Sequence, residues 1–254
     1  MPLLEVIDIN KRFGGVVAVQ DFSMKIEKQQ IVGIIGPNGA GKTTILNLIS
    51  KVLNADSGSI FLDGNNITNL NQEQVSRLGM ARTFQNIRLF QGLNVWGNVK
   101  VPFDHKPRYT FIEALLMMPR KFKGERITGK EAEKCLALFG LDKYKDESPV
   151  ALPYGLQRKL EIARALALEP KVLMLDEPAA GLNPEEAQGL VGFLKTITET
   201  INTSIIIIEH RMDVIMGLCD WIYVQDFGKT IAEGTPREIQ VDPVVIAAYL
   251  GKEE

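Results

Sequence analysis

The residues with the clearest chemical meaning lie in the segment GPNGAGKTT, residues 36–44. It matches G-x-x-x-x-G-K-[ST], in which glycines let the backbone point its N–H groups at a phosphate. Lys42 is expected to reach the β- and γ-phosphates, and the Thr43 hydroxyl to bind Mg²⁺. A chance glycine-rich turn need not follow an apolar strand and open a helix, as this segment does. The expected nucleotide-binding residues here are Gly36, Pro37, Asn38, Gly39, Ala40, Gly41, Lys42, Thr43 and Thr44.

The acidic pair Asp176 and Glu177 ends the apolar run KVLMLDEP. A buried strand would deliver Asp176 to its carboxyl end, where the carboxylate could hold Mg²⁺ directly or through water. Glu177 would point elsewhere and could act as a general base on the attacking water. The alternative is that the pair merely ends a strand before Pro178, but the phosphate loop upstream favours the catalytic interpretation.

Two other polar residues follow apolar segments. Gln85, in RTFQNIRLF, has a side chain long enough to sense Mg²⁺ and the γ-phosphate. His210 ends the run TSIIIIEH and is expected at the same sheet edge as Asp176. A lone histidine is more often structural, but its place after a buried strand favours a γ-phosphate contact.

The elements that must position these residues alternate between strand and helix, which is typical of an α/β fold with a mostly parallel core sheet. The predicted strand regions are 3–9, 31–36 and 56–67, with fully buried parallel strands in the apolar runs 171–178 and 203–210 and a hairpin at 221–234. The predicted helices are 42–53, 183–200 and 242–251, and the second begins Asn-Pro-Glu-Glu, which is a good capped start. Residues 86–151 show no obvious strand and are expected to form an inserted helical subdomain.

The composition excludes several classes of protein. The chain has 254 residues, and its formal net charge of −2 gives no reason to expect nucleic acid as a partner. Its two cysteines are too few for a disulfide framework and indicate a reducing compartment. Its apolar runs are far shorter than the about 20 residues that a membrane-spanning helix needs. A soluble chain that reaches a membrane through partners is therefore expected.

The order of these motifs resembles that of the nucleotide-binding subunits of ABC transporters, over essentially the whole chain. Several segments are similar in particular to the LivG-type ATPases of branched-chain amino acid importers: RTFQNIRLF, LPYGLQRKLEIARALA, MLDEPAAGLNP, IIEHRMDVIMGLCDWIYV and VIAAYLG. The resemblance implies a P-loop NTPase fold in a single nucleotide-binding domain, 1–254. Residues 1–85 and 152–254 would form a RecA-like core with an antiparallel β subdomain, and 86–151 the helical subdomain.

The resemblance also implies roles for individual residues. Phe13 stands where the family stacks an aromatic ring on adenine, and this interpretation is favoured over the alternative of a core residue, although aromatic residues are commonly buried. Gln85 matches the Q-loop glutamine, which also contacts the metal, and Asp176 matches the Mg²⁺ ligand. Glu177 matches the catalytic glutamate, and His210 matches the switch histidine.

The chain departs from the family in its signature helix, where Leu-Ser-Gly-Gly-Gln is usual and residues 152–158 read LPYGLQR. Pro153 lacks both the serine hydroxyl and a backbone N–H. Gly155, Gln157 and the positive helix end are still expected to meet the ATP of a partner subunit. Asn183 replaces an aspartate that the family usually carries after the Asp-Glu strand.

An ordinary amphipathic helix would account for the apolar face of this segment, but not for its unusual first residues. The apolar positions 160, 162, 163, 166 and 167 lie near i, i+3, i+4 spacing. Lys159, Glu161 and Arg164 are expected on the more polar side.

The resemblance implies an Mg-ATP hydrolase that pairs head to tail with a second ABC ATPase subunit, either itself or a sibling. Its other partners would be two transmembrane permease subunits and, indirectly, a substrate-binding protein, at the cytoplasmic face of the inner membrane. Residues 86–99 are the favoured permease contact, whereas the basic segment 105–126 is expected to pack within the insertion rather than on lipid. The alternatives are an importer of urea or another amide, a lipopolysaccharide-export ATPase, or a chromosome- or ribosome-associated ABC protein. The last is disfavoured because the insertion lacks sustained heptads.

Overall fold

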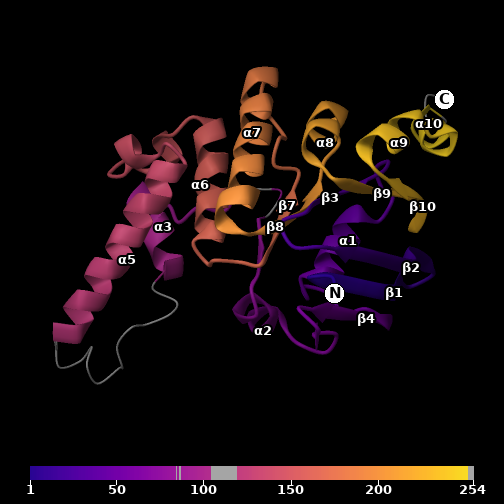
Figure 1. The fold of residues 1–254 in the computed structure, drawn as a ribbon, viewed down its shortest axis with the longest axis horizontal. Helices are drawn as coiled ribbons and strands as arrows, with labels where there is room; N and C mark the ends of the chain where they lie inside the picture. The colour runs from indigo at the N-terminus through magenta and orange to yellow at the C-terminus, as the bar shows by residue number, and fades with distance from the viewer. Residues whose placement is uncertain (84, 86, 104–118, 251–254) are drawn as a thin grey trace. The chain divides into compact units, whose positions relative to one another are not determined.

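The structure is a computed structural model that describes residues 1–83, 85, 87–103 and 119–250 (Figure 1). Side chains are described for all of these except 119–124 and 250. The chain divides into two compact units, Met1–Gln85 with Lys171–Glu254, and Asn86–Pro170. Most of the basic segment 105–126 lies outside the described residues, so the expectation that it packs within the insertion stays a prediction.

The first unit is built on a six-stranded sheet in the order β10-β9-β3-β8-β7-β6. All neighbouring pairs are parallel except β10 with β9, which confirms the mostly parallel core. Strands β3, β7 and β8 are buried along their whole length, which explains their unbroken apolar sequences. The strands are β3 (Ile31–Ile35), β6 (Met80–Arg82), β7 (Val172–Asp176), β8 (Ser204–Ile208), β9 (Trp221–Asp226) and β10 (Lys229–Gly234).

A second, antiparallel sheet in the same unit confirms the expected β subdomain. Its order is β2-β1-β4-β5, formed by β1 (Leu4–Phe13), β2 (Val16–Ile26), β4 (Ser57–Leu62) and β5 (Asn65–Asn66). Its buried side chains share one apolar core with α1 (Lys42–Ile49). Strand β2 was not predicted from the sequence. Its pairing with β1 shifts register three times, and its Asp21 has a left-handed backbone with φ 49°.

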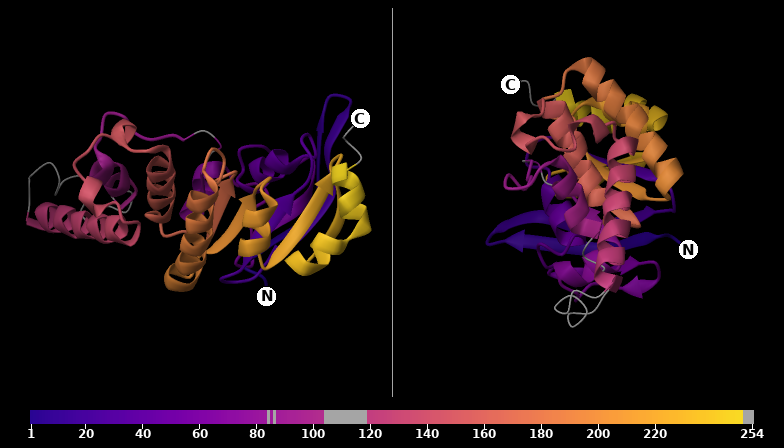
Figure 2. Two further views of the ribbon diagram at one scale, coloured as in Figure 1. Left: turned by 90° about the horizontal axis from the view of Figure 1, so that it is seen from above. Right: turned by 90° about the vertical axis from the view of Figure 1, so that its left-hand side faces the viewer.

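Three helices of the first unit, α7 (Pro184–Ile201), α8 (Met212–Leu218) and α9 (Pro236–Val241), lie along the face of the core sheet opposite the antiparallel sheet (Figures 1 and 2). Helix α7 begins with a capping box, because the Asn183 side chain accepts a hydrogen bond from the Glu186 N–H while Glu186 accepts one from the Asn183 N–H. Besides these helices and α1, the first unit contains α2 (Gln72–Arg77) and α10 (Pro243–Leu250).

The second unit is helical, and no strand occurs among its described residues, as expected for the insertion. Its helices are α3 (Val95–Phe103), α5 (Pro119–Leu138) and α6 (Tyr154–Leu166), and α3 packs against both of the others. The predicted helical subdomain, 86–151, lies within this unit, which continues through the signature helix α6 to Pro170. In neither unit does a described helix have the length and apolarity to cross a membrane.

Helix α6 carries a buried ion pair that contradicts one expectation. The Arg158 Nη1 and Glu161 Oε2 atoms lie 3.0 Å apart, and their side chains are only 1% and 2% exposed. The prediction that Glu161 lies on a polar face was wrong, because a partner one turn away lets the carboxylate be buried. Burial raises the pKa of Glu161, against the opposing effect of the Arg158 charge.

Arg158→Ala is expected to destabilise this unit by about 3–5 kcal/mol, because it leaves a buried carboxylate without its partner. Urea unfolding followed by Trp96 fluorescence in a Trp221→Phe background would measure this change in the second unit alone. The double variant Arg158→Met/Glu161→Leu should recover most of the loss. A single variant as stable as the parent would contradict the assignment.

Candidate functional site

The phosphate loop connects β3 to α1, and two of its glycines are required by close backbone contacts. Gly36 has φ 146°, and a Cβ atom there would lie 2.0 Å from the Gln225 carbonyl oxygen. Gly41 has φ 96°, and a Cβ atom there would lie 2.3 Å from the Ala18 carbonyl oxygen. Only glycine tolerates these conformations at such distances, so the loop is pressed between β2 and β9.

Lys42 opens α1 and holds its ammonium group inside the loop. Its Nζ donates hydrogen bonds to the carbonyl oxygens of Gly36 and Pro37, each at 2.8 Å, and the residue is only 6% exposed. The loop from Asn38 to Thr44 lines a cavity of about 390 Å³. A buried cation and a helix N-terminus facing one cavity favour an anionic ligand such as a phosphate chain.

Glu177 brings together polar residues from distant parts of the sequence at the edge of this cavity. The Glu177 carboxylate lies 2.9 Å from His210 Nε2 through one oxygen and 2.9 Å from Gln85 Nε2 through the other. Glu177 and His210 both line the cavity with the phosphate loop. The structure thus brings together the residues predicted to hydrolyse and to sense the nucleotide.

Asp176 lies just before Glu177 at the end of β7, and its carboxylate is buried. It accepts a hydrogen bond from Arg82 Nη2 at 2.9 Å. Arg82 Nη1 also donates to Asn47 Oδ1 at 2.6 Å and to Ser50 Oγ at 3.0 Å. Arg82 was not predicted as a site residue, although its position three residues before Gln85 was a usable signal.

The residues proposed for Mg²⁺ are Thr43, Asp176 and Gln85, which offer hydroxyl, carboxylate and amide oxygens. Mg²⁺ prefers such oxygen ligands and takes few of them from the protein, with phosphate oxygens and water supplying the rest. Across the described parts of the chain, no three His, Cys, Asp or Glu side chains form a metal cage. This donor set therefore fits a magnesium ion that arrives with a nucleotide.

The aromatic side chain at the cavity is not the one expected. Phe13, predicted to stack on adenine, ends β1 and is 47% exposed, with Lys11 Nζ 5.8 Å from its ring centre. It is absent from the side chains that line the described cavity, whereas Phe227, in the β9–β10 turn, lines it and is 75% exposed. The adenine contact of Phe13 stays a prediction. The sequence did offer a signal for Phe227, because this aromatic residue directly precedes Gly228 in the turn of the predicted hairpin.

Gly155 and Gln157 lie in the first turn of α6, in the unit of residues 86–170. Pro153 is the N-cap residue, and its carbonyl accepts hydrogen bonds from the Leu156 and Gln157 N–H groups at 2.9 and 3.0 Å. Gln157 Nε2 donates to the Leu152 carbonyl at 2.8 Å. Proline is therefore compatible with this helix start, and the nucleotide contact of Gly155 and Gln157 stays a prediction.

Comparisons with known proteins agree with this geometry. Residues 19–180 match the family model described as "ABC transporter", and residues 229–254 match "Branched-chain amino acid ATP-binding cassette transporter". The chain is 40% identical to the high-affinity branched-chain amino acid transport ATP-binding protein BraF of Pseudomonas aeruginosa, covering 99% of this chain and 98% of the relative. It is 39% identical to the corresponding protein LivG of Escherichia coli, with the same coverage.

Solved structures lead to the same conclusion. The ADP conformation of an ATP-binding cassette of an ABC transporter superposes with a TM-score of 0.86 and 30% identity, covering 99% of this chain and 100% of that one. The observed fold agrees with these matches, which extend over nearly the entire chain. The chain belongs to the ABC transporter family, as one of its ATP-binding cassettes.

Proposed function

We propose that this chain is the Mg-ATP-hydrolysing subunit of an importer for branched-chain or other hydrophobic amino acids. The observation that carries the substrate class is the identity of 39–40% over nearly the full length to BraF and LivG, whose names specify branched-chain amino acid transport. The match of residues 229–254 to a branched-chain amino acid cassette model supports the same class.

The geometry at Glu177 supports hydrolysis by general-base catalysis. Gln85 and His210 each contact a different carboxylate oxygen, so the carboxylate is already oriented when it takes a proton from the attacking water. Lys42 places a positive charge at the loop that would bind the β- and γ-phosphates. A bound Mg²⁺, held by Thr43, Asp176 and Gln85 together with phosphate oxygens, would neutralise charge on the transferred group.

The proposed partners are a second ABC ATPase subunit, arranged head to tail, two permease subunits and, through them, a substrate-binding protein. The proposed location is the cytoplasmic face of the inner membrane. Residues 86–99 support the permease contact because Phe90 and Leu93 expose apolar side chains. The buried Asn98 amide holds this loop, accepting from the Phe90 N–H at 2.8 Å and donating to its carbonyl at 3.0 Å. A rigid apolar loop is suited to a stable protein contact.

Glu177→Gln is expected to leave ATP binding intact while hydrolysis falls at least about tenfold, because an amide cannot take the proton of the attacking water. The test is steady-state phosphate release beside equilibrium binding of ATP. Glu185→Gln, which changes an exposed acid in the first turn of α7, is the matched control. Near-normal turnover of Glu177→Gln would exclude Glu177 as the base.

Pro153→Ser is expected to strengthen ATP-dependent pairing, because it adds a hydroxyl and an N–H donor at the start of α6. A hydrogen bond to a charged group contributes about 1.5–3 kcal/mol, so the effect should be about tenfold or more. ATP-dependent dimerisation in the Glu177→Gln background measures it, and Pro153→Ala, which restores only the N–H, separates the two donors. Unchanged dimerisation would mean that Gly155 and the helix end already suffice.

The substrate class is tested by reconstituting the chain with its permeases and binding protein in liposomes. Leucine, isoleucine or valine is expected to stimulate ATP hydrolysis several-fold, because the loaded binding protein favours the closed ATPase dimer. Urea added at the same concentration is the control. Stimulation by urea and not by these amino acids would support the amide importer instead.

A further inference from the structure

Two short segments beside Glu177 are joined by side chains that have no place in the hydrolysis chemistry described above. The Glu209 carboxylate, only 2% exposed, accepts a hydrogen bond from the Ala179 N–H at 2.6 Å. Its other oxygen accepts from the N–H groups of His210 and Arg211 at 2.9 and 3.2 Å. One buried carboxylate thus connects the end of β8 with the loop that follows Glu177.

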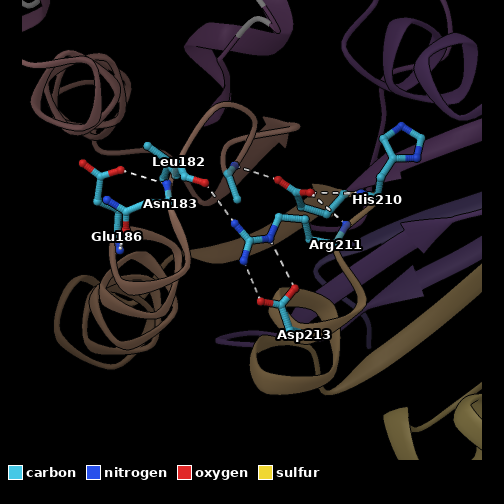
Figure 3. Close-up of polar contacts among 8 residues, drawn as sticks. Leu182, Asn183, Glu186, His210, Arg211 and Asp213 are labelled. Atoms are coloured by element: carbon cyan, nitrogen blue, oxygen red, sulfur yellow. Dashed lines mark hydrogen bonds and ion pairs between the residues drawn. The ribbon is translucent and has the colours of Figure 1, made fainter.

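Arg211 makes a second connection between the same segments. Its Nη1 donates to the Leu182 carbonyl at 3.1 Å, while Nε and Nη2 contact the Asp213 carboxylate at 3.3 and 2.8 Å. Figure 3 shows the guanidinium between Leu182 and Asp213, with the His210 ring projecting away from this cluster. Arg211 therefore contacts the backbone of the loop, whereas the His210 imidazole lies at the cavity.

The loop needs such connections because Glu177 has an unfavourable backbone conformation. Its φ is 49°, in the left-handed region that residues other than glycine rarely adopt. The Glu177 N–H donates to the Ile208 carbonyl at 2.9 Å, and the Ala180 N–H donates to the Glu177 carbonyl at 3.1 Å. A strained residue persists only where its surroundings determine its conformation, and such residues concentrate at functional sites.

We propose that Glu209 and Arg211 are positioning residues that clamp residues 179–182 and so hold Glu177 in this conformation. The inference rests on the proposed role of Glu177 as general base. With the loop clamped, the Glu177 carboxylate is presented to Gln85 and His210. Without the clamp, the backbone of Glu177 can relax to a commoner conformation, and its carboxylate turns away from both partners.

A purely structural role for Arg211 is the competing explanation, and the local contacts weigh against it. Helix α7 has its own capping box from Asn183 and Glu186, so its start does not need Arg211. The ion pair of Arg211 with Asp213 is partly exposed, and such pairs contribute little to stability. The contact with the Leu182 carbonyl is the one that reaches the loop after Glu177.

Arg211→Ala in the full chain is expected to lower kcat for ATP about tenfold while KM stays within about twofold, because small displacements of a catalytic group reduce the rate without changing substrate binding. Lys42 and the phosphate loop, which bind the nucleotide, are untouched. Asp213→Asn weakens the ion pair but keeps the Leu182 contact, and Lys195→Ala removes an exposed cation on α7. Both controls should keep the parent kcat, and Arg211→Lys should recover part of it.

A double-mutant cycle separates positioning from a general structural effect. If Arg211 acts through Glu177, then Arg211→Ala should cause no further loss of rate in a Glu177→Gln background. An equal loss in both backgrounds, or an unchanged kcat for Arg211→Ala, would overturn the proposal.

Hydrogen exchange of the peptide spanning residues 178–183 gives a readout that needs no activity. Arg211→Ala should accelerate exchange at the Ala179, Ala180 and Leu182 amides, while Lys195→Ala should not. Unchanged protection in Arg211→Ala would overturn the clamp even if hydrolysis is affected. A parent chain that fails to hydrolyse ATP would instead count against the proposed function, and the exchange experiment would still decide whether the clamp exists.

Discussion

The register of the parallel strands β3, β8 and β7 is the constraint on which the site depends. Ile34 of β3 and Asp176 of β7 both align with Ile208 of β8. The three strands therefore end at one level, and their following segments start at the same edge of the sheet. The phosphate loop, Glu177 and His210 meet there for this reason, although His210 lies 166 positions after Thr44, the last residue of the loop.

Three buried charges at the site are compensated by local contacts, and this compensation shapes the site. Asp176 is paired with Arg82, Lys42 is held by two loop carbonyls, and Glu209 accepts three backbone N–H groups. A buried charge without a partner would be costly, so each arrangement restricts the backbone around it. The same contacts that satisfy the charges also fix the loops that carry the reactive groups.

The strain at Glu177 fits this picture of a preorganised site. In a flexible loop the carboxylate would sample many orientations. The hydrogen bonds made by the backbone at Glu177 and just after it restrict the carboxylate to few orientations. In the structure the carboxylate has the orientation that places it in contact with Gln85 and His210. The orientation of the residue expected to perform the chemistry thus depends on contacts from outside the phosphate loop.

The sequence by itself determined the parts of this protein that are encoded locally. The phosphate loop, the buried strands before Asp176 and His210, and the capped start at Asn183 are all readable because glycine spacing, apolar runs and capping residues act over a few neighbouring positions. The same local patterns correctly indicated an α/β fold with a helical insertion.

Only the tertiary structure decided how the remaining polar residues are used. Arg82 and Asp176 are 94 positions apart, and Glu209 lies 30 positions after Ala179, so no local pattern could pair them. The burial of Glu161 and the placement of Phe227 at the cavity likewise depend on neighbours that the fold supplies. A side chain's chemistry can be read from its type, but its partner depends on strand order and register, which bring distant residues together.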